Sequence, residues 1–232
     1  VSVTSLGSGV FAYTEALRKV EFLCNISSIP NSAFYESGIQ TIALPSSVTS
    51  IGAEAFRECS FLTEIKLSDN LSSIGSKAFQ SCIRLLSIQL PASLTSIDSQ
   101  AFNGCYRLVE LYNLSSLSLE KGSTGSGGIA RYALKIHTSA EESSNLSLEN
   151  DLWIYADDVQ KVAVFYIGNA ETVTIPDGIQ SIFGSAFEGC QNMVTIQLPG
   201  SLIRIGDYAF SNCTKLKNIS LASINILGNS AF

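Results

Sequence analysis

The stretch Leu62-x-x-Ile65-x-Leu67-x-x-x-Leu71-x-Ser73-Ile74-Gly75-x-x-Ala78-Phe79-x-x-Cys82 recurs along the chain. The next copy keeps the pattern with Leu85, Ile88, Leu90, Leu94, Ile97, Ala101, Phe102 and Cys105, and a later copy has Met193, Ile196, Leu198, Leu202, Ile205, Ala209, Phe210 and Cys213. The Ala-Phe pair, or Val-Phe in the first copy, ends at Phe11, Phe34, Phe56, Phe79, Phe102, Phe187, Phe210 and Phe232. Successive phenylalanines are 23, 22, 23, 23, 85, 23 and 22 residues apart. A period of this length predicts a protein built of stacked repeats.

Each period divides into two halves. The first half alternates apolar and polar residues, as in Ile65-Lys66-Leu67, which is typical of a short half-buried strand. The second half spaces its apolar residues by three to five positions and predicts a tight turn or a short 3₁₀ or α segment. Prolines follow the strand in four repeats, where the missing N–H ends strand pairing at low cost; they are Pro45, Pro91, Pro176 and Pro199. One repeat leaves its apolar side uncovered, so stacking predicts a β-rich α/β solenoid with parallel strands on its concave face.

Composition excludes several classes of function. With 46% hydrophobic residues among 232, the chain has far more apolar side chains than a disordered protein. Its longest apolar run, residues 162–167, is too short to span a bilayer. A net charge of −6 with 14 Lys and Arg argues against nucleic-acid binding. The only histidine, His137, has no nucleophile or metal-ligand partner placed by a motif. We therefore predict a protein without catalytic activity, cofactor or metal.

The recurring motif LxxIxLPxxLxSIGxxAFxxC resembles the BspA-like leucine-rich repeats of microbial surface proteins. The resemblance covers about residues 1–119 and 168–232. It implies a right-handed leucine-rich-repeat solenoid in a secreted or cell-surface protein that takes part in adhesion. As partner we expect a protein, such as a host surface or extracellular-matrix protein, or a glycan.

Between Phe102 and Phe187 the period is lost, and this predicts three segments. Residues 1–134 form repeats, the last one irregular, with Ala133-Leu134 displaced nine residues by the glycine-rich insertion 122–128. Residues 135–167 form a β-hairpin island with Asp157-Asp158 in its turn, and residues 168–232 return to the repeat. No polar cap is visible at either end, where Val3–Gly7 is half a repeat, so we expect a segment of a longer chain.

Five of the six cysteines lie three residues after a repeat phenylalanine: Cys59, Cys82, Cys105, Cys190 and Cys213. Zinc sites draw their thiolates from close pairs, whereas these are 23 residues apart within each run of repeats. Ser37 and Thr14 occupy the same position in other repeats, which favours a small buried group that hydrogen-bonds to neighbouring backbone. Disulfide pairing is the alternative. The acidic pairs Glu141-Glu142 and Asp157-Asp158 do not match a calcium loop and are expected to be solvated.

Side chains that point away from the core along the strands are not explained by packing. This outward column is polar and without a dominant charge, and its candidate binding residues are Glu64, Lys66, Gln89, Glu110, Tyr112 and Gln197. A solvated sheet face of β-favouring residues is the plainer interpretation. Three functional hypotheses remain open. The first is recognition of a protein by the concave sheet and the 135–167 island, and the second is a spacer with no ligand of its own. The third is carbohydrate binding, for which Tyr112 and Trp153 are the candidate aromatic residues.

Overall fold

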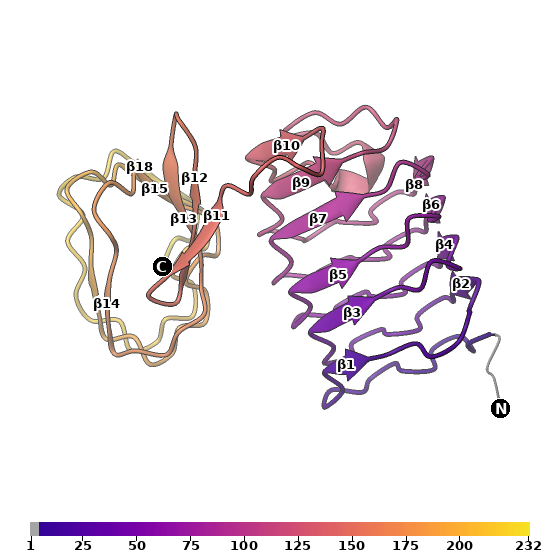
Figure 1. The fold of residues 1–232 in the computed structure, drawn as a ribbon. Coiled ribbons are helices and arrows are strands. Elements are labelled where there is room, and N and C mark those ends of the chain that lie inside the picture. Colours follow the sequence, from indigo (N-terminus) through magenta and orange to yellow (C-terminus); the bar gives the residue numbers. More distant parts are fainter. Residues whose placement is uncertain (1–4) are drawn as a thin grey trace. The chain divides into compact units, whose positions relative to one another are not determined.

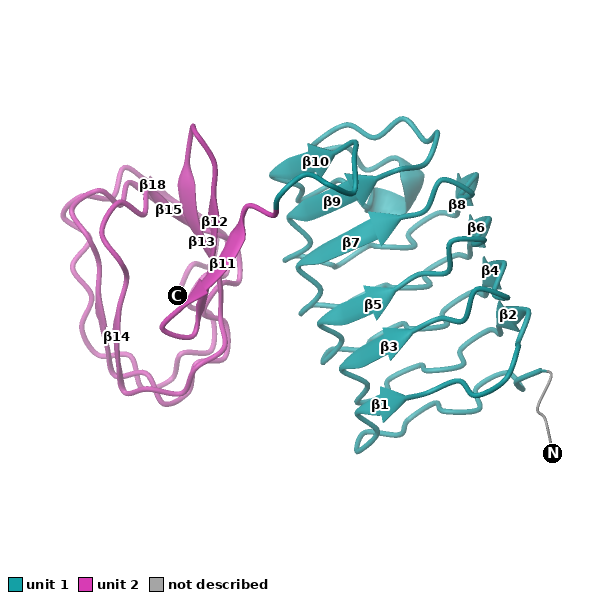
Figure 2. Ribbon diagram, viewed as in Figure 1, with its two compact units in different colours: residues 1–143 teal, residues 144–232 magenta. Residues whose placement is uncertain are grey.

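The computed structural model describes residues 5–232 and forms two compact units, the first ending at Ser143 and the second comprising Ser144–Phe232 (Figure 2). Val3 and Thr4 of the predicted first half-repeat lie outside the described residues. The expected solenoid of stacked parallel strands is confirmed in both units. The expected three-part division at 134/135 and 167/168 stays a prediction.

The first unit stacks its longer strands into two three-stranded parallel sheets, seen edge to edge in Figure 1. One sheet contains β1 (Lys19–Val20), β3 (Thr41–Ala43) and β5 (Glu64–Lys66), and the other β7 (Ser87–Leu90), β9 (Glu110–Asn113) and β10 (Lys135–His137). Equivalent residues of successive repeats are paired, for example Ile42 with Ile65 and Ile88 with Leu111. The register therefore places one apolar column in the core and leaves the alternate column outside.

A second ladder of very short strands lies behind the first. It consists of β2 (Ser28–Ile29), β4 (Ser50–Ile51), β6 (Ser73–Ile74) and β8 (Ser96–Ile97) in one parallel sheet. This ladder and the turns after it replace the helical segments expected from the sequence. The extended Ser-Ile dipeptide turns its isoleucine inward while its backbone pairs with the next repeat, as Ile51 does with Ile74. Within residues 5–232 the only helical element is the 3₁₀ turn η1 (Ser126–Gly128).

The repeat phenylalanines form a continuous stack through the core of the first unit. Neighbouring ring centroids are 5.0 to 5.2 Å apart from Phe11 to Phe102. The backbone N–H of Phe79 donates to the carbonyl of Ala101 at 2.7 Å, and Phe34 and Phe56 make the same bond to the next repeat. The alanine beside the phenylalanine is fully buried from Ala33 to Ala101, so a larger side chain there would displace packed atoms.

The glycine-rich insertion covers the last phenylalanine of the stack in the first unit. The N–H of Phe102 donates to the carbonyl of Gly127 at 2.8 Å, which is the bond other repeats make to the Ala of Ala-Phe. Gly127-Gly128 therefore takes that position, and the expectation for Ala133-Leu134 is wrong. Gly127 is buried at φ +67°, and an added Cβ would lie 2.8 Å from the Cβ of Ala101. Gly127 is thus a packed position of the insertion that only glycine fits.

The second unit begins with an antiparallel meander that joins the solenoid directly. Strands β11 (Leu146–Glu149), β12 (Leu152–Ala156) and β13 (Lys161–Tyr166) are antiparallel, and β13 then pairs in parallel with the ladder of β15 (Ser181–Ile182), β17 (Arg204–Ile205) and β18 (Ile226–Leu227). On the other side of the unit, β14 (Thr172–Thr174) pairs with β16 (Thr195–Gln197). The predicted hairpin turn is confirmed: Asp157 Oδ1 accepts from the N–H groups of Val159 and Gln160, both at 2.9 Å.

Tyr166, at the end of β13, occupies the phenylalanine position of a repeat. Its ring stacks on Phe187 with centroids 5.4 Å apart, and its N–H donates to the carbonyl of Ala186 at 2.9 Å. The ladder continues through Phe210 to Phe232. The strand of the meander nearest the solenoid is therefore also the first rung of the second core.

Candidate functional site

The exposed side of β5 and β7 carries three of the predicted binding residues. Ile65 and Ile88 point into the core, so their neighbours Glu64, Lys66 and Gln89 point to solvent and are exposed. Among the described residues, these three side chains make no hydrogen bond or ion pair with the chain. We call the exposed residues of β3, β5 and β7 the strand face; they are Ala43, Glu64, Lys66 and Gln89. It offers a carboxylate, an ammonium and an amide on neighbouring turns.

Gln197 is exposed too, but it belongs to β16 of the second unit and accepts a hydrogen bond from Thr174 Oγ1 at 3.0 Å. The predicted set is thus divided between two units, and the structure brings together only its members on the first one.

Glu110 was expected to face solvent because of its place in the outward column, but the structure buries it. Its side chain is 0% exposed, and its Oε1 lies 2.8 Å from Nε2 of the equally buried His137. His137 lies in β10, which extends the sheet beyond β9 and places the imidazole over that column. Burial of Glu110 beneath this strand removes it from the accessible surface.

A second carboxylate holds His137 from the other side. His137 Nδ1 lies 3.0 Å from Glu142 Oε2, while Glu142 Oε1 accepts from the N–H groups of Thr138 and Ser139 at 2.8 and 3.1 Å. Each ring nitrogen of His137 therefore faces a carboxyl oxygen, one from Glu110 and one from Glu142. The hydrogen bonds from His137, Thr138 and Ser139 lower the pKa of Glu142 to about 2. This cluster fastens β10 and the loop after it to the first unit.

Tyr112 completes the cluster and is only partly available to a ligand. Its ring stacks on the imidazole of His137, with centroids 4.3 Å apart and planes 12° from parallel. Tyr112 is half-buried as a result. Sequence reasoning missed this contact because the two residues are 25 positions apart in the irregular repeat.

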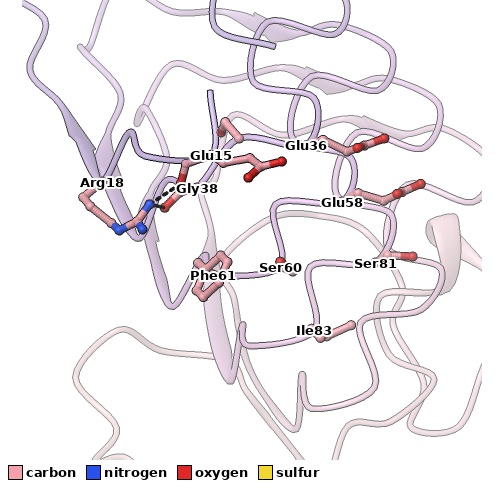
Figure 3. Close-up of a pocket in the computed structure, with 10 residues that line it drawn as sticks. Glu15, Arg18, Glu36, Gly38, Glu58, Ser60, Phe61, Ser81 and Ile83 are labelled. Atoms are coloured by element: carbon pink, nitrogen blue, oxygen red, sulfur yellow. Dashed lines mark hydrogen bonds between the residues drawn. The ribbon is translucent and has the colours of Figure 1, made fainter. Parts of the chain in front are cut away.

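A cavity of about 560 Å³ lies in the first unit where the turns after the phenylalanine stack lead back to the long strands (Figure 3). One part of its lining is acidic, with Glu15, Glu36 and Glu58 from successive turns. Glu36 and Glu58 both have left-handed backbone, at φ +51° and +60°. The equivalent positions of the other repeats share this conformation, and three of them hold residues that adopt it more readily, Gly104, Gly189 and Asn212, while the other two hold Tyr13 and Ser81.

The opposite part of the cavity lining is aromatic and basic. Phe61 is 38% exposed, and the guanidinium carbons of Arg18 and Arg84 lie 5.5 and 4.8 Å from its ring centroid. Arg18 is fixed by hydrogen bonds to the carbonyls of Glu15 and Gly38. The cavity therefore presents both signs of charge beside an apolar ring. The repeat pattern does not predict this cavity, because its lining residues stand at positions where the motif permits any side chain.

The cysteines that lie three residues after a repeat phenylalanine form a cysteine column. Its three members in the first unit, Cys59, Cys82 and Cys105, are structural, as predicted, and are fully buried. Each Sγ donates to the carbonyl of a phenylalanine one repeat earlier, at 2.9 to 3.1 Å. Burial raises the pKa of Cys59 to about 11 and that of Cys105 to about 12. Within residues 5–232, no group of three or more His, Cys, Asp and Glu side chains is placed to hold a metal ion, and no helix is long and apolar enough to cross a membrane.

Comparison with known proteins identifies the repeat. Residues 1–109 and 160–232, more than half of the chain, match the family described as BspA type Leucine rich repeat region (6 copies). The chain belongs to the BspA-type leucine-rich repeat family. The second matched block begins one residue before β13, where the structure places the rung of Tyr166. No curated protein sequence matches this BspA-type chain.

Solved structures similar to this BspA-type chain are bacterial leucine-rich repeat proteins. A leucine-rich cell surface protein from Faecalibacterium prausnitzii is 23% identical over 99% of this chain and 54% of its own, with a TM-score of 0.48. A leucine-rich repeat protein from Eubacterium ventriosum is 19% identical over 93% of this chain and 57% of its own, with a TM-score of 0.44. One from Bacteroides capillosus is 30% identical over 47% of this chain and 85% of its own, with a TM-score of 0.39. The chain spans little more than half the length of the first two.

Proposed function

We propose that this chain is a non-catalytic binding domain of a secreted or cell-surface protein and that it recognises a protein partner through the strand face of its first unit. The observation that carries the proposal is the exposure of the Glu64, Lys66 and Gln89 side chains together with their lack of hydrogen bonds within the part of the chain that the structure describes. They are exposed on a rigid sheet and, among the described residues, are not engaged by any other side chain. A partner gains their hydrogen bonds without first breaking internal ones. Location at the cell surface and a role in adhesion are part of the proposal and rest on the family.

The rigid backbone under this face supports recognition. The core residues of β5 and β7, Ile65 and Ile88, are 7% and 2% exposed, and each strand is held in register by its neighbours. Side chains projecting from such strands keep their spacing, so a partner loses little entropy in ordering them. Glu64 and Lys66 supply opposite charges for complementarity, which favours a polar protein surface over a nucleic acid or lipid.

Binding of the purified chain to an array of extracellular-matrix proteins and glycans tests this proposal. The double variant Lys66→Ala/Gln89→Ala removes two exposed groups and leaves Tyr112 in place, because Tyr112 packs on His137. A matched control, Lys217→Ala/Gln191→Ala, removes the same side-chain types from exposed positions of the second unit. We expect binding to a protein spot that weakens at least tenfold in the first variant and is unchanged in the control.

Other outcomes would contradict the proposal and identify its alternatives. Binding that survives the Lys66→Ala/Gln89→Ala change moves recognition away from the strand face. Signal confined to glycan spots would indicate carbohydrate binding. If a folded sample gave no binding signal anywhere on the array, the result would favour a spacer with no ligand of its own.

A further inference from the structure

The cysteine column differs between the two units. In the first unit its members are fully buried, as described above. In the second unit Cys190 and Cys213 are only half-buried, so the expectation of a uniformly buried column is wrong for this pair. The same repeat position therefore presents an inaccessible environment in one unit and a solvent-accessible one in the other.

The turns that carry Cys190 and Cys213 are bonded to each other. Phe187 N–H donates to the carbonyl of Ala209 and Gly189 N–H to that of Ser211, both at 2.8 Å, which places the two cysteines at equivalent positions of adjacent rungs. Cys213 Sγ donates to the carbonyl of Phe187, three residues before Cys190, at 3.0 Å.

The spacing of these turns suits a cross-link between the two sulfurs. Side chains at successive positions of this column do touch, since Ser37 Oγ and Cys59 Sγ are 3.5 Å apart in the first unit. Paired strands lie about 4.8 Å apart, within the Cα separations of about 4.4 to 6.8 Å that disulfides span.

Cys213 also differs chemically from the buried thiols. The side-chain hydrogen bond with Cys190 is the main cause that lowers the pKa of Cys213, and the backbone of Cys190 adds to it, against burial and the charge of Glu188. In the first unit burial raises the pKa of Cys59, Cys82 and Cys105. Since the thiolate is the nucleophile in disulfide exchange, Cys213 is the better attacking group.

We propose that Cys190 and Cys213 form a redox-responsive dithiol, which a low-molecular-weight disulfide converts into a cross-link between two successive turns of the second unit. The Cys213 thiolate attacks one sulfur of the small disulfide, forms a mixed disulfide and expels one thiolate. Cys190 loses its proton and attacks the sulfur of Cys213, which expels the second thiolate. Two protein thiols are oxidised and the small disulfide is reduced to two thiols, so electrons and protons balance.

Oxidised glutathione is the probe for this proposal. The full chain is used as the Cys24→Ser variant, so that the cysteine outside the column does not react. After incubation, free thiols are alkylated and the digest is mapped by mass spectrometry. We expect a single linked peptide pair containing Cys190 and Cys213, with the mass of two hydrogens lost, while Cys59, Cys82 and Cys105 are recovered alkylated once the chain is unfolded.

Two further variants separate the roles of the sulfurs. Adding Cys190→Ser leaves Cys213 without a resolving thiol, so a glutathione adduct on Cys213 should accumulate. Adding Cys213→Ser should slow oxidation of Cys190 at least tenfold. The cross-link should also raise the melting temperature of the second unit by on the order of 10 °C, because it closes a loop of one repeat in the unfolded chain. Recovery of Cys190 and Cys213 unlinked, or equal reaction of Cys82 and Cys105, would overturn the proposal.

Discussion

Single residues whose side chains are small or absent decide where this chain can close its turns. Gly127 has φ +67°, and a Cβ there would lie 2.6 Å from the carbonyl oxygen of Asp98. Gly122 also has positive φ, +81°, but a Cβ there would meet nothing within 4 Å. We expect Gly127→Ala to lower the free energy of unfolding by about 3 kcal/mol, since backbone strain and overpacking add. Gly122→Ala should cost about 1 kcal/mol from strain alone.

Urea denaturation of both glycine variants measures the difference. Equal losses would show that the close approach of Gly127 to the backbone of the preceding repeat has no energetic weight. The Gly122→Ala variant thus serves as the control for the positive φ that the two positions share.

Glu142 predicts a pH dependence of stability. Its pKa is about 2 in the folded chain against an ordinary value of 4.5, so folding favours the charged form. The resulting stabilisation is fully present above about pH 4.5 and is lost as the pH falls toward 2. Unfolding free energies should therefore drop more steeply over this range in the parent than in Glu142→Gln, which keeps an acceptor for the N–H groups of Thr138 and Ser139. Parallel curves would contradict the role assigned to the His137–Glu142 contact.

At the scale of elements, β13 joins the meander to the second solenoid through one ring. Tyr166 is 5% exposed and stacks on Phe187, and its hydroxyl accepts from the N–H of Ala170 at 3.3 Å. Tyr166→Ala should lower the free energy of unfolding by about 3 kcal/mol, as for other buried aromatic truncations. Tyr208→Ala removes an equal side chain that is 51% exposed and should cost under about 0.5 kcal/mol. Thermal unfolding compares the two, and similar melting temperatures would refute the placement of Tyr166 in the core.

The regular elements could be predicted because a local rule repeats. Strands such as β5 and β7 follow from alternation within each period, and the phenylalanine stack follows from a spacing of 22 or 23 residues. The second ladder was missed because a dipeptide such as Ser73-Ile74 is too short to show a period of two. Tyr166 was missed because it lies 21 residues before Phe187 and follows Phe165 rather than Ala.

The candidate site was less predictable than the fold. Exposure of Lys66 and Gln89 follows from alternation alone, and the structure confirms it. Burial of Glu110 depends on β10, whose strand comes after the irregular insertion and whose position no periodicity sets. The Phe61 cavity and the accessibility of Cys190 likewise depend on how turns from different repeats approach one another. Such contacts arise only in the assembled solenoid, so the spacing of residues in the sequence does not predict them.

At the scale of the whole molecule, the described residues form two hydrophobic cores with no residue in common. One contains Phe34 to Phe102 and the other Phe187 and Phe210. Because the stability of a solenoid is a sum over repeats and their neighbours, damage should stay within the unit that carries it. The only tryptophan, Trp153, lies in β12 of the second unit and serves as a reporter for that unit alone.

Phe79→Ala should therefore lower the stability of the first unit by about 3–5 kcal/mol and leave the second unchanged. In urea, the circular-dichroism transition should shift or split while the midpoint of Trp153 fluorescence stays in place. Phe210→Ala is the matched variant of the second core. It should lower the free energy of unfolding of the second unit by a similar amount, and the midpoint of Trp153 fluorescence should fall accordingly. If Phe79→Ala moved the Trp153 transition as far as Phe210→Ala does, the two cores would unfold as one cooperative system. The Cys190–Cys213 cross-link would then stabilise the whole chain rather than the second unit alone.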